Sequence, residues 1–285
     1  MLRTPGPWPA AGGRTGTRCA IPCCPDAKPG AAPSVAERGH HELAGRPARC
    51  LHLVSRPRRR GKLESRRPSE AEWSAVSDES RPLRFILASS SPARRQTLID
   101  AGLRPEIMVS DVDEDAFTAV DVVGLVSQLS QAKAEKVFGD LTGTEDVLIV
   151  ACDSLLELRG EAMGKPADAQ QAIDRWRQMR GSTGHLHTGH HVIARRAGAV
   201  AAAAAVATTE VMFANIDDDE IAAYVATGEP LKVAGAFTVD GLGGAYVTGV
   251  CGDPHNVVGI SLPLLRRLFA ELDVLWHSLW HPDQG

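Results

Sequence analysis

Hydrophobic and polar residues follow short, regular patterns from residue 83 onward, and these patterns predict alternating strands and helices. Compact apolar runs, which are typical of buried strands, occupy residues 83–88, 106–112, 146–152 and 245–250. Apolar positions three and four residues apart, which are typical of amphipathic helices, occupy residues 122–138, 168–179, 217–226 and 261–272. Strands that alternate with helices favour an α/β fold.

Local start and stop signals add three further elements. Ser91 and Pro92 begin a helix that stops at Gly102, because serine caps helix N-termini, proline is tolerated in the first turn and glycine ends helices. Residues 186–195 and 208–216 are predicted to be two strands of a hairpin around residues 196–198. The alanines of 201–205 prefer helix by intrinsic propensity, so the start of the second strand stays open.

Residues 1–80 differ from the rest of the chain. They contain 14 Lys and Arg against 8 Asp and Glu, a net charge of +6, whereas residues 81–285 contain 17 against 27, a net charge of −10. The first segment also has 10 of the 18 prolines and no apolar period. Such a segment cannot bury enough apolar surface to offset its ordering entropy. We predict a disordered N-terminal extension over 1–80 and one folded domain over 81–285.

The extension offers two candidate chemistries, and both are weaker than a solvated tail. A basic run at residues 56–60 could bind nucleic acid or anionic lipid. A zinc site is disfavoured, because the candidate ligands contain only one regularly spaced pair. These ligands are Cys19, Cys23, Cys24, His40, His41, Cys50 and His52. The acidic remainder argues against a nucleic-acid partner. With no secretory signal after Met1 and no apolar run long enough for a transmembrane helix, we expect a cytoplasmic protein with no membrane partner.

The first chemical motif of the folded part lies between a strand and a helix. Residues 87–95 form a serine-rich turn that contains Ser89, and the helix that follows has Arg94 and Arg95 in its first turn. The free N–H groups and the positive dipole end of a helix N-terminus bind phosphate well. An ordinary capped helix with solvated arginines is the alternative.

Carboxylates and lysines supply three further candidates. Residues 111–115 are nearly all acidic and follow a strand, so they could bind a divalent cation or form a plain acidic loop. Asp153 follows the apolar strand 146–152, and ligands of α/β sheets bind at strand ends. Asp153 is therefore a candidate metal ligand or general base. Lys133 and Lys165 could offset phosphate charge there, although either could be a solvated lysine.

Four histidines follow on a predicted strand in the pattern H-x-H-x-x-H-H. His185 and His187 would share one face of that strand and could bind zinc, but His190 and His191 follow a break at Gly189. We favour surface or cross-strand histidines without a metal.

The order of these motifs resembles the Maf family of nucleoside triphosphate pyrophosphatases, and its actinobacterial members in particular, from about residue 83 to residue 280. The matching motifs are Leu-Ala-Ser-x-Ser-Pro-x-Arg at 87–94, Asp-Glu at 113–114, Ala-Lys-Ala at 132–134, Asp153, Gly-Lys-Pro at 164–166, Gly-Glu-Pro at 228–230, Ala-Gly-Ala-Phe at 234–237, and Asn-Val-Val-Gly at 256–259.

The resemblance implies a fold, a reaction and a set of site residues. The implied fold is an elongated, twisted mixed sheet with flanking helices and a central cleft, similar to ITPase-like enzymes. The implied reaction converts nucleoside triphosphates into monophosphate and pyrophosphate and removes non-canonical or excess nucleotides. It uses Mg²⁺ or Mn²⁺ at Glu114 and Asp153, with Asp153 as the catalytic residue. Phosphate would bind Ser89, Arg94, Lys133 and Lys165. A cytoplasmic enzyme, often a homodimer, is also implied.

The chain departs from the family pattern at positions that bear on specificity. Ser154 replaces the usual threonine, and Asp240 stands where dTTP/UTP-selective members have glutamine. Because a carboxylate only accepts hydrogen bonds while an amide also donates, a uracil or thymine preference is in doubt. Gly184 replaces a histidine and Phe237 a tyrosine. Two other hypotheses stay open: a catalytically weak nucleotide-binding regulator of cell division, and a nucleic-acid binder acting through residues 1–80.

Overall fold

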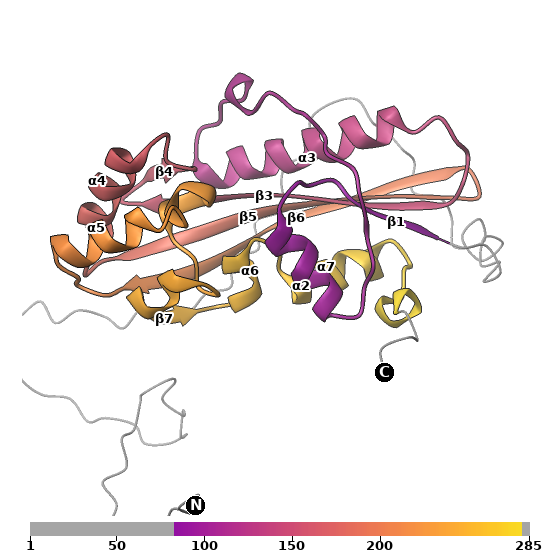
Figure 1. The fold of residues 1–285 in the computed structure, drawn as a ribbon. Helices are drawn as coiled ribbons and strands as arrows, with labels where there is room; N and C mark the ends of the chain where they lie inside the picture. The colour runs from indigo at the N-terminus through magenta and orange to yellow at the C-terminus, as the bar shows by residue number, and fades with distance from the viewer. Residues whose placement is uncertain (1–82, 281–285) are drawn as a thin grey trace, which may run out of the picture. The chain divides into compact units, whose positions relative to one another are not determined.

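A computed structural model of the chain describes residues 83–280, which form a mixed seven-stranded sheet flanked by helices (Figure 1). Its strand order is β2-β1-β3-β5-β6-β7, and β4 pairs with β3 off this path. The strands are β1 (Arg84–Leu87), β2 (Glu106–Ile107), β3 (Val147–Leu158), β4 (Glu161–Met163), β5 (Thr183–Arg196), β6 (Ala199–Phe213) and β7 (Val247–Cys251). β1 pairs in parallel with β2 and β3, and the other pairs are antiparallel. The predicted α/β class is confirmed.

Each α-helix begins at a side chain that accepts a hydrogen bond from a backbone N–H of its first turn. Such caps satisfy donors that the helix itself cannot bond. Ser91 is one of them, as the sequence signals indicate. The helices are α2 (Pro92–Asp100), α3 (Val122–Asp140), α4 (Ala169–Met179), α5 (Asp218–Ala226), α6 (Pro254–Val258) and α7 (Leu262–Glu271).

Several predicted boundaries were wrong. The predicted strand 106–112 is only the two-residue β2, whereas β3 continues through Leu158 instead of ending at Cys152. The alanines of 201–205 are strand, because β6 pairs with β5 along its whole length and the sheet overrides their helix propensity. The short elements β4 and α6 were missed. The zinc, basic and disorder predictions for residues 1–80 lie outside the described residues.

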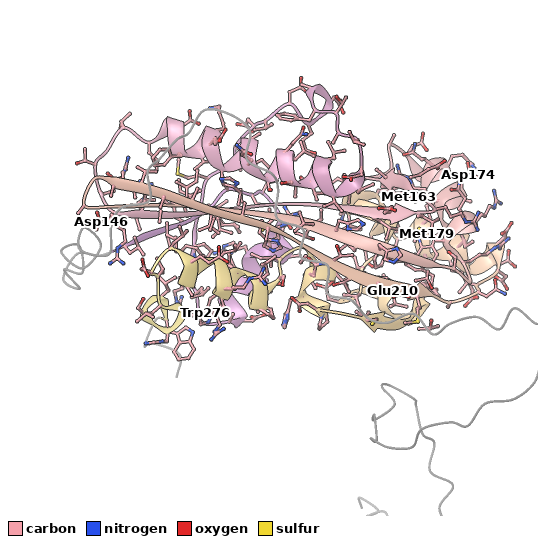
Figure 2. All side chains as sticks on the ribbon, turned by 180° about the vertical axis from the view of Figure 1, so that it is seen from behind. Asp146, Met163, Asp174, Met179, Glu210 and Trp276 are labelled. Atoms are coloured by element: carbon pink, nitrogen blue, oxygen red, sulfur yellow. The ribbon has the colours of Figure 1, made fainter. Side chains whose placement is uncertain are left out.

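The two faces of the sheet are covered by different helices. On one face α3 packs against Ile86, Ile149 and Ile193, and on the other α7 packs against Leu148 and Val192. A third core cluster surrounds Trp176 of α4. Figure 2 shows Met163 and Met179 of this third cluster near one end of the long strands, and Trp276 near the other end. None of the described helices is long and apolar enough to cross a membrane.

The edge of β3 that faces away from β5 is paired at both ends and open in the middle. β1 pairs with Val147–Val150, and β4 pairs with Leu156–Leu158. Residues 151–155 therefore have no neighbouring strand on this edge. Ala88 N donates to Val150 O at 2.8 Å, so the main-chain groups of Val150 face this edge. Main-chain N–H and C=O groups face the same edge at every second residue of a strand, so those of Cys152 and Ser154 face this edge too. A ligand placed here can reach both side chains and backbone.

Candidate active site

Asp153 lies in the middle of the open segment of β3. The prediction that it ends its strand was wrong, because β3 continues beyond it. The strand that ends here is β1, whose last residue, Leu87, pairs with Val150. The site is still where a parallel strand stops, as expected for ligand sites in α/β sheets. Asp153 is held rigidly by this strand, and only 5% of it is exposed.

Lys133 of α3 forms an ion pair with Asp153. Its Nζ lies 2.5 Å from Asp153 Oδ1 and 2.7 Å from Glu114 Oε1. Lys133 is largely buried, while Glu114 remains more than half exposed. The structure thus brings together three of the predicted residues, from the loop before α3, from α3 and from β3.

A glycine allows α3 to lie this close to the sheet. Gly189 of β5 pairs directly with Asp153, and a Cβ atom there would lie only 2.2 Å from the carbonyl oxygen of Val126. Val126 is about two turns before Lys133 on α3, so both residues lie on the same side of the helix. Gly189 therefore allows α3 to pack closely enough on the sheet for Lys133 to contact Asp153.

The surroundings of Asp153 favour its protonated form more than water does. Burial raises the pKa of the Asp153 carboxyl, and the positive charges of Lys133 and Arg94 oppose this without cancelling it. Among the residues that the structure describes, only Lys133 donates a hydrogen bond to this carboxylate, through Oδ1. A carboxylate with a raised pKa and one uncommitted oxygen is suited to accept a proton from water.

Arg94 of α2 approaches the same segment from the other side. Its guanidinium donates to three oxygens: Gly259 O at 2.8 Å, Ser89 Oγ at 3.1 Å and Ser154 Oγ at 2.9 Å. Gly259 has a φ of +114°, and a Cβ atom there would lie 3.1 Å from Arg94 Nε. Within the described part of the chain, three of the five guanidinium N–H groups are bonded, which leaves two for a ligand.

The turn before α2 supplies further donors beside Arg94. Ser91 caps the helix by accepting from Arg94 N, and Ser89 Oγ accepts from Ser91 N at 3.2 Å. Backbone N–H groups of the first turn and the helix dipole are directed to this point. The groups expected to bind phosphate therefore lie together beside β3, and phosphate binding itself stays a prediction.

Comparison with known proteins identifies the origin of this arrangement. A family model described as "Maf-like protein" matches residues 84–272. This chain is a member of the Maf family. The curated nucleoside triphosphate pyrophosphatase of Salinispora tropica is 51% identical over 212 residues, which cover 72% of this chain and 93% of that protein. The one from Streptomyces coelicolor is 50% identical over 201 residues, 70% and 96% of the two chains. The predicted resemblance is confirmed.

Two residues that the Maf motifs single out, Lys165 and Asp240, make no hydrogen bond or ion pair with Asp153 or Lys133. Lys165 follows β4, is exposed, and has no hydrogen bond or ion pair with another described residue. Asp240 is also exposed and lines a pocket of about 300 Å³ between its loop and helices α2, α6 and α7. Gln96, Thr97, Asp100 and His255 contribute other polar groups to this pocket.

The Gly-Glu-Pro motif of the Maf pattern has a structural role. Glu229 accepts hydrogen bonds from the hydroxyls of Tyr224 and Thr238 and from the backbone N–H groups of Leu242 and Gly243. These bonds fold the loop that carries Asp240. The sequence motif marked Glu229 but could not show which groups it binds.

The histidines were predicted to be surface or cross-strand residues, and a surface position is wrong for three of them. His187, His190 and His191 are buried in the sheet. His190 accepts from Ser261 N at 2.8 Å, and burial lowers its pKa to about 4, so it is neutral at physiological pH. Within residues 83–280, no group of three or more His, Cys, Asp or Glu side chains is arranged to hold a metal ion.

The family pattern includes Thr188, but the sequence indicated neither its role nor the anchoring role of α6. Thr188 Oγ1 lies 2.9 Å from Ser154 Oγ and donates to Asn256 O at 3.3 Å. The fully buried Asn256 in turn donates through Nδ2 to Leu186 O and Thr209 Oγ1. The Asn-Val-Val-Gly motif was recognised, but only the fold shows that it lies beneath Arg94.

Proposed function

We propose that this protein hydrolyses nucleoside triphosphates to nucleoside monophosphate and pyrophosphate. The observation that carries the proposal is the buried Asp153 carboxylate with its raised pKa, between the cations Lys133 and Arg94. A lone carboxylate provides a base, and the flanking cations provide charge for a polyphosphate. The names of the Maf relatives support the same reaction.

In the proposed reaction the water oxygen attacks the α-phosphorus while Asp153 accepts the proton. The bond between the α-phosphorus and its bridging oxygen to the β-phosphorus breaks, and pyrophosphate leaves. Lys133 and the free N–H groups of Arg94 offset the charge on the phosphates. Ser89 and the α2 N-terminus orient them. Because all these groups are held in place before the substrate arrives, positioning and electrostatics supply most of the rate enhancement.

The donor set around Asp153 suits a hard divalent cation such as Mg²⁺ or Mn²⁺. The carboxylates of Asp153 and the exposed Glu114 would hold it. Because a carboxylate has about four lone-pair sites, Asp153 would keep one with which to accept the proton from water. Two carboxylates are too few for a protein-only cage, which agrees with the lack of a three-ligand group in the described residues. Mg²⁺ is commonly held by one or two carboxylates together with substrate phosphates. When bound, the cation would neutralise the developing phosphate charge.

Lys165 and Asp240 are proposed to contact the outer parts of the substrate. Lys165 is an exposed cation with no ion-pair partner within residues 83–280, and we propose that it approaches the polyphosphate. Asp240 can only accept hydrogen bonds, so it favours bases with an amino group over uracil and thymine. Removal of non-canonical or excess nucleotides is the role that such an activity would serve. The cytoplasmic location and the homodimer that the resemblance implies stay predictions.

The test is pyrophosphate release by the full chain from a panel of canonical and modified nucleoside triphosphates, with Mg²⁺, Mn²⁺ or a chelator. We expect equal amounts of monophosphate and pyrophosphate, which rules out stepwise loss of phosphate. We also expect the chelator to abolish release. A folded protein that binds nucleotides but releases no pyrophosphate from any of them would contradict the proposal and favour a nucleotide-binding regulator.

A further inference from the structure

Two serine hydroxyls bind the same guanidinium but have opposite hydrogen-bond polarity. Ser89 Oγ and Ser154 Oγ both accept from Arg94, through Nη1 and Nη2. The difference lies in where each hydroxyl proton goes, and it decides what each serine can do for a substrate.

The proton of Ser154 is committed to the protein. Thr188 has a single hydroxyl proton, which it donates to the carbonyl oxygen of Asn256. Either hydroxyl could donate in the 2.9 Å contact between Ser154 and Thr188, and we assign Ser154 Oγ as the donor and Thr188 Oγ1 as the acceptor because Thr188 gives its proton to Asn256 O. The bonds run in one direction, from Arg94 to Ser154, to Thr188 and to Asn256 O. Ser154 has no proton left for a nucleobase or a phosphate.

The proton of Ser89 is free. Ser89 Oγ accepts from Arg94 Nη1 at 3.1 Å and from Ser91 N at 3.2 Å, so both of its lone pairs are used. No described residue accepts its proton. Ser89 can therefore donate to a phosphate oxygen beside the two free N–H groups of Arg94.

The far end of the chain of bonds is anchored in the core. Asn256 is fully buried, and its side chain ties α6 to β5 and β6 through Leu186 O and Thr209 Oγ1. Three residues on, Gly259 O accepts from Arg94 Nε at 2.8 Å. Helix α6 thus holds Arg94 at two points, directly through Gly259 and indirectly through Thr188 and Ser154.

We infer that Ser154 and Thr188 are positioning residues that aim Arg94 at the substrate phosphates, and that Ser154 does not select the base. The inference rests on the proposed function for its substrate and assigns Ser154 a different role from the specificity role expected from its place in the sequence. Arg94 and Ser89 contact the substrate, while Ser154 and Thr188 act only through Arg94.

The experiment is a double-mutant cycle on the full chain, with Arg94→Lys as the second change. Lysine keeps the charge but cannot make three directed bonds. Affinity for inorganic pyrophosphate is measured by calorimetry, and kcat and KM are measured for CTP and UTP. Thr208→Val is the matched control, because its hydroxyl lies on β6 and bonds His187.

We expect Ser154→Ala, which removes one hydrogen bond to the charged Arg94, to weaken pyrophosphate binding about tenfold. Thr188→Val removes only bonds between neutral groups behind Ser154, so it should weaken binding less, by about threefold. In the Arg94→Lys background each should change it by less than about twofold, because coupled residues do not add. Ser154→Thr and Thr188→Ser should restore binding. The ratio of kcat/KM for CTP and UTP should stay unchanged in Ser154→Ala.

An equal loss in the Arg94→Lys background would overturn the inference, and so would a changed CTP to UTP ratio in Ser154→Ala. If Thr188→Val does not fold, the Ser154 cycle decides alone. If the effects of Ser154 and Arg94 on pyrophosphate binding are coupled but the protein hydrolyses no nucleotide, the inference stands and the proposed function is refuted. If the protein hydrolyses nucleotides but the effects are not coupled, the function stands and the inference is refuted. A wild type that binds no pyrophosphate would refute both.

Discussion

Asp153 and Glu229 are both carboxylates at the centre of hydrogen-bonded clusters, but they meet different kinds of donor. Asp153 accepts from one lysine and is otherwise buried, and its pKa is raised. Burial alone would raise the pKa of Glu229 too, but donors from Thr238, Gly243 and Leu242 lower it below its usual value. When neutral donors bond both carboxylate oxygens, as at Glu229, they stabilise the negative charge and hold the loop in place. When one oxygen has no donor, as at Asp153, the carboxylate can still accept a proton.

The largest effect is expected from Asp153→Asn. The amide cannot accept a proton from water, so kcat should fall about a thousandfold, within the range for loss of a general base. The free energy of unfolding should not fall at neutral pH. Because the pKa of Asp153 is raised, its ionised form costs stability above the ordinary value of 3.8. Unchanged pyrophosphate release would remove Asp153 from the mechanism, and a large loss of stability in urea would make its role structural.

Glu229→Gln should produce the opposite pattern. The new amide N–H₂ replaces one acceptor oxygen and faces donors it cannot bond, which should lower the free energy of unfolding by about 1–3 kcal/mol. Urea denaturation measures this change. Glu161→Gln, an exposed change on β4, should stay within about 0.5 kcal/mol. If both variants were equally stable, the hydrogen bonds around Glu229 would contribute nothing to the fold.

Gly189→Ala tests whether close packing of α3 positions the Asp153 cluster. The added methyl group would meet the Val126 carbonyl, so α3 must move away from the sheet, at a cost of about 1–3 kcal/mol. Lys133 moves with it, and kcat should fall more than KM rises. Gly139→Ala in α3 is the control, because no atom lies within 4 Å of the Cβ that it adds. Full activity in Gly189→Ala would show that Lys133 does not depend on this contact.

The smallest effect concerns the pH profile. Activity requires ionised Asp153, so kcat/KM should fall with decreasing pH at a value above the ordinary 3.8. The contribution of Glu229 to stability is also lost on acidification, but the pKa of Glu229 is shifted in the opposite direction from that of Asp153. The lowered pKa of Glu229 keeps that contribution intact above the ordinary 4.5, and it is lost only as pH falls through the lower folded value. An acid limb of activity at or below pH 3.8 would contradict the environment described for Asp153.

Most of the fold and of the site could be predicted from local signals. The helix cap Ser91, the apolar core of β3 and the strand-to-helix turn at Ser89 are short-range features, and all occur where the sequence indicated. The family motifs then placed Lys133, Arg94 and Glu114 in one site. The strand end that the sequence predicted wrongly depends on long-range contacts, since β3 continues past Cys152 only because β4 and β5 pair with it.

The sequence by itself determined which groups carry the chemistry, because residue type sets charge, hydrogen-bonding capacity and helix-capping ability. Only the tertiary structure decided which of these groups are free to act. Asp153 retains an unbonded oxygen while Glu229 does not, and Ser89 retains its proton while Ser154 gives its own to Thr188. The physical reason is that a polar group has a fixed number of donors and acceptors. How many are already used depends on partners brought together from distant parts of the chain.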